Sequence, residues 1–173
     1  MTTRNLDARL SSYSPTVLSI FRIVVGFLFA INGSSKLFGW PLDIAQPAGS
    51  WPAWWAGLIE LVTGLLVLIG LFTRPAAFIA SGEMAVAYFW QHQPNGLWPL
   101  DDRVGGNGGE LAVLFCFAFF LLVFIGGGAY ALDARRRRRV GTTAGRATAD
   151  RATADRRGGR FRGWRPGRFA RRY

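Results

Sequence analysis

Long apolar stretches alternate with short polar connections along this chain. Four such stretches are each close to the ~20 residues that a helix needs to cross a hydrocarbon layer of roughly 30 Å, and segments rich in glycine and proline separate them. They cover about residues 16–37, 53–72, 75–90 and 111–132. The pattern predicts an all-α integral membrane protein in which four transmembrane helices form a bundle.

Charge divides the chain into two parts. Residues 134–173 contain fifteen arginines and two aspartates, whereas residues 1–133 contain six basic and eight acidic residues. The basic part has too little apolar content to bury a core, so it is predicted to be disordered. We therefore expect an N-terminal segment (1–15), a membrane domain (16–133) and an arginine-rich tail (134–173).

The basic residues of the membrane domain indicate its orientation. Arg4 and Arg9 precede the first stretch, Arg74 lies between the second and third, and Arg135–Arg139 follow the fourth. Basic connections remain on the cytoplasmic side of a membrane. Both termini are therefore expected in the cytoplasm.

Charged residues within the apolar stretches need partners, because a charge in hydrocarbon costs on the order of 3 kcal/mol. Helix rise places Arg22 and Glu83 at nearly the same depth, which predicts a buried ion pair between them. Such a pair can also serve only to fix helix register. The sequence leaves both roles open.

A second polar group is expected nearer the outer face. Lys36, Glu60, His92 and Glu110 all lie toward the outer ends of their stretches. They predict an open chamber with these four as ligand-binding residues, Glu60 and His92 as the candidates for catalysis, and the Arg22–Glu83 pair as its floor. Ordinary roles compete: an interfacial lysine or histidine, and a first-turn acid at Glu110.

Metal and nucleotide chemistry find little support in the sequence. One histidine with scattered carboxylates has no metal-ligand spacing, and the chain has no dinucleotide-binding glycine motif. The lone cysteine, Cys116, cannot form an intramolecular disulfide or a dithiol. No metal or nucleotide cofactor is expected.

Several short motifs recur in a fixed order with these charges. They are Arg22-x3-Gly26, Gly33-Ser-Ser-Lys36-Leu37, Glu60-x3-Gly64, Gly70-Leu-Phe-Thr-Arg74-x-Ala76-Ala77, Met84-x2-Ala87, His92, Glu110 and Gly126-Gly127-Gly128-Ala-Tyr-Ala-Leu132-Asp133. Over residues 16–133 the chain thereby resembles the DoxX family of small four-helix bacterial membrane proteins. The resemblance implies a multi-pass protein of the bacterial cytoplasmic (inner) membrane.

The resemblance also implies membrane-linked redox biology. Members of the family are associated with thiosulfate:quinone oxidoreductase and with thiol-handling or superoxide-removing enzymes. It suggests a membrane subunit of a redox complex with such soluble enzymes as partners. Because this chain lacks a dithiol and a haem-ligand pair, electron transfer would need a bound quinone or the cofactor of a partner.

Two other functions stay open. The chain could be a non-catalytic anchor that recruits soluble partners through its tail, or a transporter of protons or small molecules that uses Glu60 and Glu83.

The start of the tail is the expected surface for membrane lipids or a partner. Five consecutive arginines leave the last apolar stretch there, and each adds attraction to the anionic lipids of the inner leaflet. These membrane-surface or partner-binding residues are Arg135, Arg136, Arg137, Arg138 and Arg139. For the remainder of the tail, lipid or an acidic protein is favoured over nucleic acid.

Overall fold

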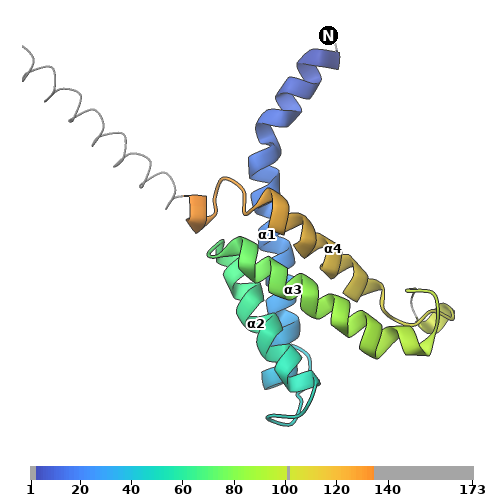
Figure 1. The fold of residues 1–173 in the computed structure, drawn as a ribbon. Helices are drawn as coiled ribbons and strands as arrows, with labels where there is room; N and C mark the ends of the chain where they lie inside the picture. Colours follow the sequence, from blue (N-terminus) through green and yellow to red (C-terminus); the bar gives the residue numbers. More distant parts are fainter. Residues whose placement is uncertain (1–2, 101, 135–173) are drawn as a thin grey trace, which may run out of the picture. The chain divides into compact units, whose positions relative to one another are not determined.

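The computed structural model describes residues 3–100 and 102–134, and every regular element in these ranges is helical (Figure 1). The α-helices are α1 (Thr3–Phe38), α2 (Ala53–Ile69), α3 (Thr73–Ala87) and α4 (Glu110–Ile125). A π-helical turn, η1 (Tyr88–His92), continues α3, and two 3₁₀ turns, η2 (Gln93–Asn95) and η3 (Asp102–Val104), lie in the loop before α4. The prediction of an all-α fold is confirmed for this part of the chain.

The predicted tail lies outside the described residues, apart from Ala134. The same holds for the five arginines expected to bind lipid or a partner, which are Arg135, Arg136, Arg137, Arg138 and Arg139. Their role at the membrane surface therefore stays a prediction.

Two helix boundaries differ from the apolar stretches. Helix α1 begins at Thr3 and continues through Pro15, so it includes the polar residues that precede the first apolar stretch. Helix α4 ends at Ile125, since Gly126 and Gly128 adopt left-handed φ values of 89° and 78°. By length and apolar character, Arg9–Phe38 could cross a membrane, while Ala53–Ile69 and Glu110–Ile125 are shorter apolar helices.

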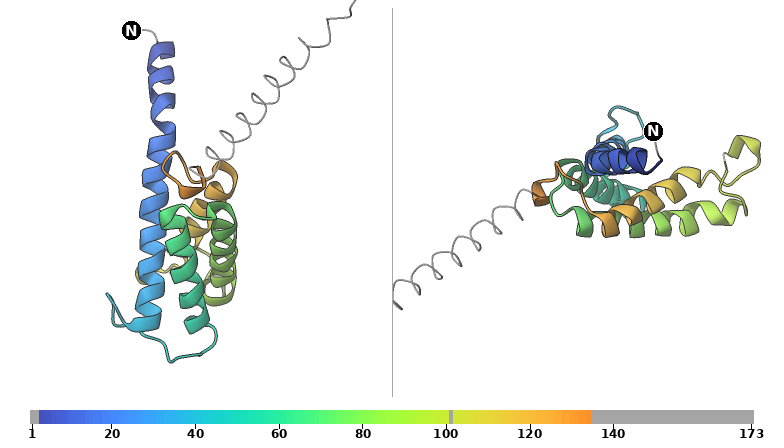
Figure 2. Two further views of the ribbon diagram at one scale, coloured as in Figure 1. Left: turned by 90° about the vertical axis from the view of Figure 1, so that its left-hand side faces the viewer. Right: turned by 90° about the horizontal axis from the view of Figure 1, so that it is seen from above.

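Helices α1 and α2 pack closely side by side, and so do α3 and α4 (Figures 1 and 2). Glycines bring the first two backbones together. A Cβ on Gly26 would lie 2.7 Å from the amide nitrogen of Leu68, and one on Gly64 would lie 2.6 Å from that of Ala30. Small residues allow this direct approach of helices in membranes. Both glycines therefore lie in the contact between α1 and α2.

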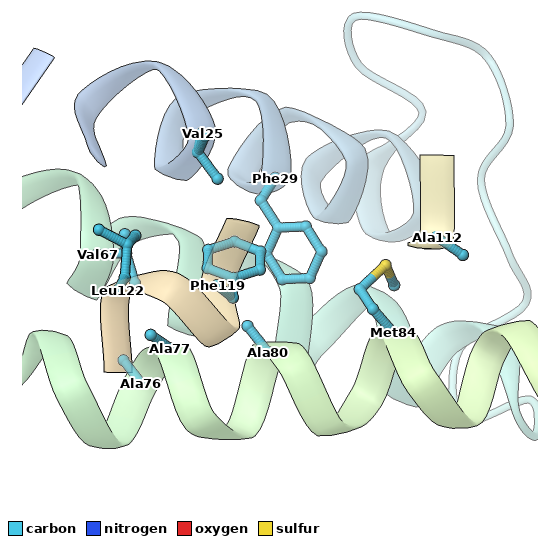
Figure 3. Packing of buried hydrophobic residues seen from close by; sticks show 10 residues of the cluster. All are labelled: Val25, Phe29, Val67, Ala76, Ala77, Ala80, Met84, Ala112, Phe119 and Leu122. Carbon is cyan, nitrogen blue, oxygen red and sulfur yellow. The ribbon is translucent and has the colours of Figure 1, made fainter. Parts of the chain in front are cut away.

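A compact apolar core joins the two helix pairs (Figure 3). Phe29 of α1 and Phe119 of α4 are almost fully buried, and their rings meet edge to face with centroids 4.6 Å apart. Buried alanines of α3, Ala77 and Ala80 among them, leave room for these rings. Outside the core many large apolar side chains are exposed, as expected for a surface that faces lipid.

The chain after α4 returns across the middle of α1 and the turn between α2 and α3. We call Gly126–Asp133 the closing segment. Its backbone amides bond to α1, with Ala129 donating to the Pro15 carbonyl at 3.3 Å and Tyr130 donating to Ser19 Oγ at 3.2 Å. These bonds fix the segment against α1.

The last residue of the closing segment, Asp133, caps helix α3. Its carboxylate accepts hydrogen bonds from the amides of Phe72 at 3.0 Å and Thr73 at 2.9 Å. Phe72 has a left-handed φ of 49°, which is uncommon for a residue other than glycine. The cap therefore holds the tight turn between α2 and α3 in an otherwise unfavourable conformation.

Candidate functional site

A cavity of about 650 Å³ lies among α1, α2, α3, η1 and α4. Phe29, Met84 and Ala112 belong both to the apolar core and to the lining of this cavity, so the core forms one of its walls (Figure 3). The polar lining comes from residues that the sequence singles out, namely Lys36, Glu60, Glu83 and His92. Helices far apart in the sequence thus supply one site.

Lys36 and Glu60 form a salt bridge in the cavity. Lys36 Nζ donates to Glu60 Oε1 at 2.6 Å, and the Glu60 side chain is only 3% exposed against 28% for Lys36. The close contact of α1 with α2 sets this geometry, because Gly57 leaves space for the lysine stem; a Cβ on Gly57 would lie 2.8 Å from Lys36 Cβ. One charged pair is thereby fixed at the cavity wall.

Glu83 adds a second carboxyl to the lining. Its Oε2 atom is buried without a hydrogen-bond partner, and the same is true of Glu60 Oε2. A buried polar atom without a partner costs free energy comparable to a lost hydrogen bond. Both unpartnered atoms belong to residues that line the cavity. The site is therefore equipped to receive a polar group from outside the chain.

His92 completes the polar lining from the end of η1. Its Nδ1 lies 3.2 Å from the carbonyl oxygen of Asn107, which can only accept. Asn107 itself organises the loop before α4: its side chain donates to the Gly96 carbonyl at 3.0 Å and accepts from the Gly109 amide at 2.8 Å. The loop thus holds the imidazole at the cavity.

Most of the remaining lining is aromatic or aliphatic. Three tryptophans contribute, with Trp51 and Trp90 in edge-to-face contact at a centroid distance of 6.0 Å and Trp55 elsewhere in the lining. Pockets of about 300–1,000 Å³ with apolar walls and a few placed polar groups are typical of small-molecule sites. The cavity matches this description.

Glu110, the fourth predicted ligand-binding residue, does not line the cavity. It is exposed at the first turn of α4, where a carboxylate stabilises the positive end of the helix dipole. Lys36, Glu60 and His92 do come together as predicted, and Glu83 joins them. Their roles in ligand binding, and those of Glu60 and His92 in catalysis, stay predictions.

The predicted ion pair between Arg22 and Glu83 is wrong. The buried Arg22 guanidinium donates to three carbonyl oxygens, those of Val67 at 2.5 Å, Leu68 at 2.7 Å and Gly127 at 2.8 Å. These carbonyls lie at the end of α2 and in the closing segment. Glu83 lies ten residues beyond the start of α3, roughly 15 Å along the helix axis. The two side chains therefore do not share a depth.

Arg22 has a structural role that the sequence does not suggest. It donates to carbonyls in the last turn of α2, where helical hydrogen bonding ends, and it joins α1, α2 and the closing segment. The acidic charge that acts on it is that of Asp133. Asp133 belongs to a motif that the sequence shows, but its capping role is not apparent there, and Asn107 in the loop before α4 is not a candidate from the sequence.

The arrangement can bind the polar head of a largely apolar molecule and exchange protons with it. One ammonium, two carboxyls and one imidazole face a cavity whose other walls are mostly hydrophobic, with two amide side chains, Asn32 and Gln91. Within residues 3–100 and 102–134, no three His, Cys, Asp or Glu side chains gather as a metal-binding group.

Comparison with known proteins identifies the family. The sequence model of the DoxX family matches residues 17–93. An uncharacterized protein of Haemophilus influenzae is 42% identical over 130 residues, which are 72% of this chain and 93% of that protein. The inner membrane protein YphA of Escherichia coli is 29% identical over 132 residues, 70% of this chain and 91% of the relative.

A third relative and the solved structures complete the comparison. An uncharacterized membrane protein of Mycobacterium tuberculosis is 28% identical over 138 residues, 72% of this chain and 83% of that protein. No solved structure matches the chain significantly. The match to the family model and the Haemophilus relative, together with two relatives named as membrane proteins, show that the chain belongs to the DoxX family of membrane proteins.

Proposed function

We propose that this DoxX protein is a membrane subunit of a redox complex and that it binds a lipid-soluble electron carrier of the quinone type in its cavity. The observation that carries the proposal is the cavity of about 650 Å³, in which a charged cluster lies against tryptophans. Its volume suits a substituted aromatic ring. Its apolar walls suit a molecule that travels in the bilayer.

The polar cluster gives this ligand an orientation. Glu60 and His92 contribute to the lining from different elements, α2 and η1, and both are side chains that can exchange protons. A ring bound between them would expose its oxygens to these groups. Electrons would come from, or pass to, a soluble partner, for which we propose a thiol-handling or superoxide-removing enzyme.

We further propose that α1 to α4 each span the cytoplasmic membrane, with both termini in the cytoplasm. The arginine distribution supports this orientation, and the exposed apolar side chains of all four helices support contact with lipid. Protease added to inside-out vesicles should remove the 134–173 tail from the full chain, whereas protease added to intact spheroplasts should not. Cleavage in spheroplasts alone would contradict the orientation.

Glu60→Gln tests the function of the cavity. The substitution keeps the size of the side chain but removes the charge that pairs with Lys36, so we expect weaker retention of the ligand. Native mass spectrometry of the detergent-extracted wild type should show a bound quinone, and the variant should retain about tenfold less, which corresponds to about 1.4 kcal/mol. The redox phenotype of the cells should weaken while expression stays unchanged.

Glu110→Gln is the matched control, because Glu110 is an exposed carboxyl outside the cavity lining. It should retain the ligand as the wild type does. A second control separates the proposal from an anchoring role through the tail. If deletion of residues 141–173 abolishes the phenotype while Glu60→Gln leaves it intact, the chain is an anchor and the proposal is wrong.

Transport is a second candidate, favoured by the two carboxyls in a membrane-protein cavity. It differs from the first in requiring net movement of a solute. Uptake into sealed vesicles that depends on Glu60 and Glu83 would support it. Uptake that both Glu→Gln variants leave unchanged would remove it.

A further inference from the structure

Two buried carboxyl oxygens in the cavity lining lack hydrogen-bond donors. Glu60 Oε2 and Glu83 Oε2 are buried and have no partner. An ionised carboxylate only accepts hydrogen bonds, and a protonated carboxyl still keeps one oxygen as an acceptor. Glu60 Oε2 therefore needs a donor, and so does Glu83 whenever its carboxyl is ionised.

His92 can add a further acceptor. Its Nδ1 faces the Asn107 carbonyl oxygen, so Nδ1 carries a hydrogen, and in the neutral imidazole Nε2 is then an acceptor. The chief donor of the lining, Lys36 Nζ, is already bonded to Glu60 Oε1. Asn32 likewise uses its amide nitrogen, which donates to the Leu28 carbonyl at 3.0 Å. The other donors of the lining, the indole N–H groups of Trp51, Trp55 and Trp90 and the Gln91 amide, belong to exposed side chains, whereas the two unpartnered acceptors are buried.

The rim of the cavity points to a ligand that arrives from lipid. Ile59 of α2 is 36% exposed, and Ile79 and Val86 of α3 are 52% and 56% exposed, although all three line the cavity. An opening edged by exposed apolar side chains favours entry from the bilayer. Gly82 lies in the same lining and, without a side chain, leaves the rim open: a Cβ there would have no atom within 4 Å.

We propose that the cavity selects a bilayer-soluble molecule whose polar head donates hydrogen bonds, so that of a hydroquinone and its quinone it prefers the hydroquinone. The two molecules share shape and apolar area, but hydroquinone hydroxyls donate whereas quinone carbonyls only accept. Hydroxyl groups would satisfy the orphaned oxygens of Glu60 and Glu83. This inference rests on the proposed function, because it assigns a redox state to the ligand of the same cavity.

Equilibrium binding to the full chain in nanodiscs tests the preference. The probes are a tritium-labelled decyl-substituted benzohydroquinone and the corresponding benzoquinone, measured without oxygen. Because a buried acceptor left unpaired is unfavourable, the hydroquinone should bind about tenfold tighter or more. Equal binding of the two probes, or tighter binding of the quinone, would overturn the inference while leaving the proposed function in place.

Glu83→Gln should change the sign of the preference. The amide has nearly the shape of the carboxyl but presents an N–H donor, which suits a quinone carbonyl. The hydroquinone should lose about tenfold in affinity, and the quinone should gain. Glu110→Gln, outside the lining, should leave both affinities unchanged. A preference that Glu83→Gln does not alter would remove Glu83 from the proposal.

Decylammonium is a third probe, because an amine is another source of N–H donors. If decylammonium binds and neither ring compound does, the preference of the cavity for hydrogen-bond donors stands, while the proposed redox function fails. If no probe binds, both fail.

Gly82→Leu should fill the open rim without a backbone clash and slow uptake of every probe, whereas Phe78→Trp, on the exposed surface of α3 outside the lining, should not.

Discussion

Arg22→Gln is expected to lower the free energy of unfolding by about 3 kcal/mol or more. Arg22 is 1% exposed and bonds to the carbonyls of Val67, Leu68 and Gly127. A charged donor contributes about 1.5–3 kcal/mol per hydrogen bond, and carbonyls left without partners add to the loss. A shorter amide cannot reach all three, so α1, α2 and the closing segment should separate more easily.

Thermal unfolding of the detergent-solubilised protein, followed by circular dichroism, measures this effect. Arg74→Gln is the matched control, because Arg74 is exposed and bonds to the Phe124 carbonyl at 3.1 Å; its loss should cost under about 1 kcal/mol. Arg22→Lys should fall between the two, since an ammonium keeps the charge without the planar fork. Equal midpoints for Arg22→Gln and Arg74→Gln would contradict the structural role of Arg22.

Gly33→Ala should cost roughly 2–3 kcal/mol of unfolding free energy, because a methyl group there has no space. An added Cβ would contact the Leu61 amide nitrogen and lie 2.6 Å from the Gly57 carbonyl oxygen. Both are backbone atoms of α2, which cannot turn aside as a side chain can. The two helices would have to separate, and the Lys36–Glu60 pair one turn away would be disturbed with them.

Gly82→Ala is the paired control within a helix. Nothing lies within 4 Å of the added Cβ, so the substitution should be neutral or should stabilise α3 by up to about 1 kcal/mol, the usual gain in helix propensity. The same unfolding measurement compares the two. A Gly33→Ala protein as stable as Gly82→Ala would show that α1 and α2 do not pack through their glycines.

Local sequence patterns predict the helices well and the glycine contacts correctly. Gly26 and Gly33 repeat at helical spacing beside charged residues, and this spacing is enough to place them on one interior face. Helix ends are harder to predict. Apolar character alone places the start of the first helix near residue 16, whereas the polar residues from Thr3 onward are also helical.

The partners of the polar side chains depend on how the helices pack, which sequence spacing alone does not specify. Lys36 and Glu60 lie near the same end of neighbouring helices, so their contact is within reach of a depth argument. The same argument fails for Arg22. Matching depths in the membrane suggests a carboxylate as its partner, whereas its actual partners include backbone carbonyls at the end of α2. Similarly, the cavity walls combine residues of five elements, and their meeting depends on how the helix pairs pack.

The closing segment also has a consequence for biosynthesis. Its bonds to Pro15, Ser19 and Gly70 join the last part of the domain to the first. While the ribosome still holds residues 126–133, the earlier helices can enter the bilayer but cannot be locked together. A nascent chain that stalls before Asp133 would therefore leave the α2–α3 turn uncapped, and maturation of the domain must wait until residues 126–133 have left the ribosome.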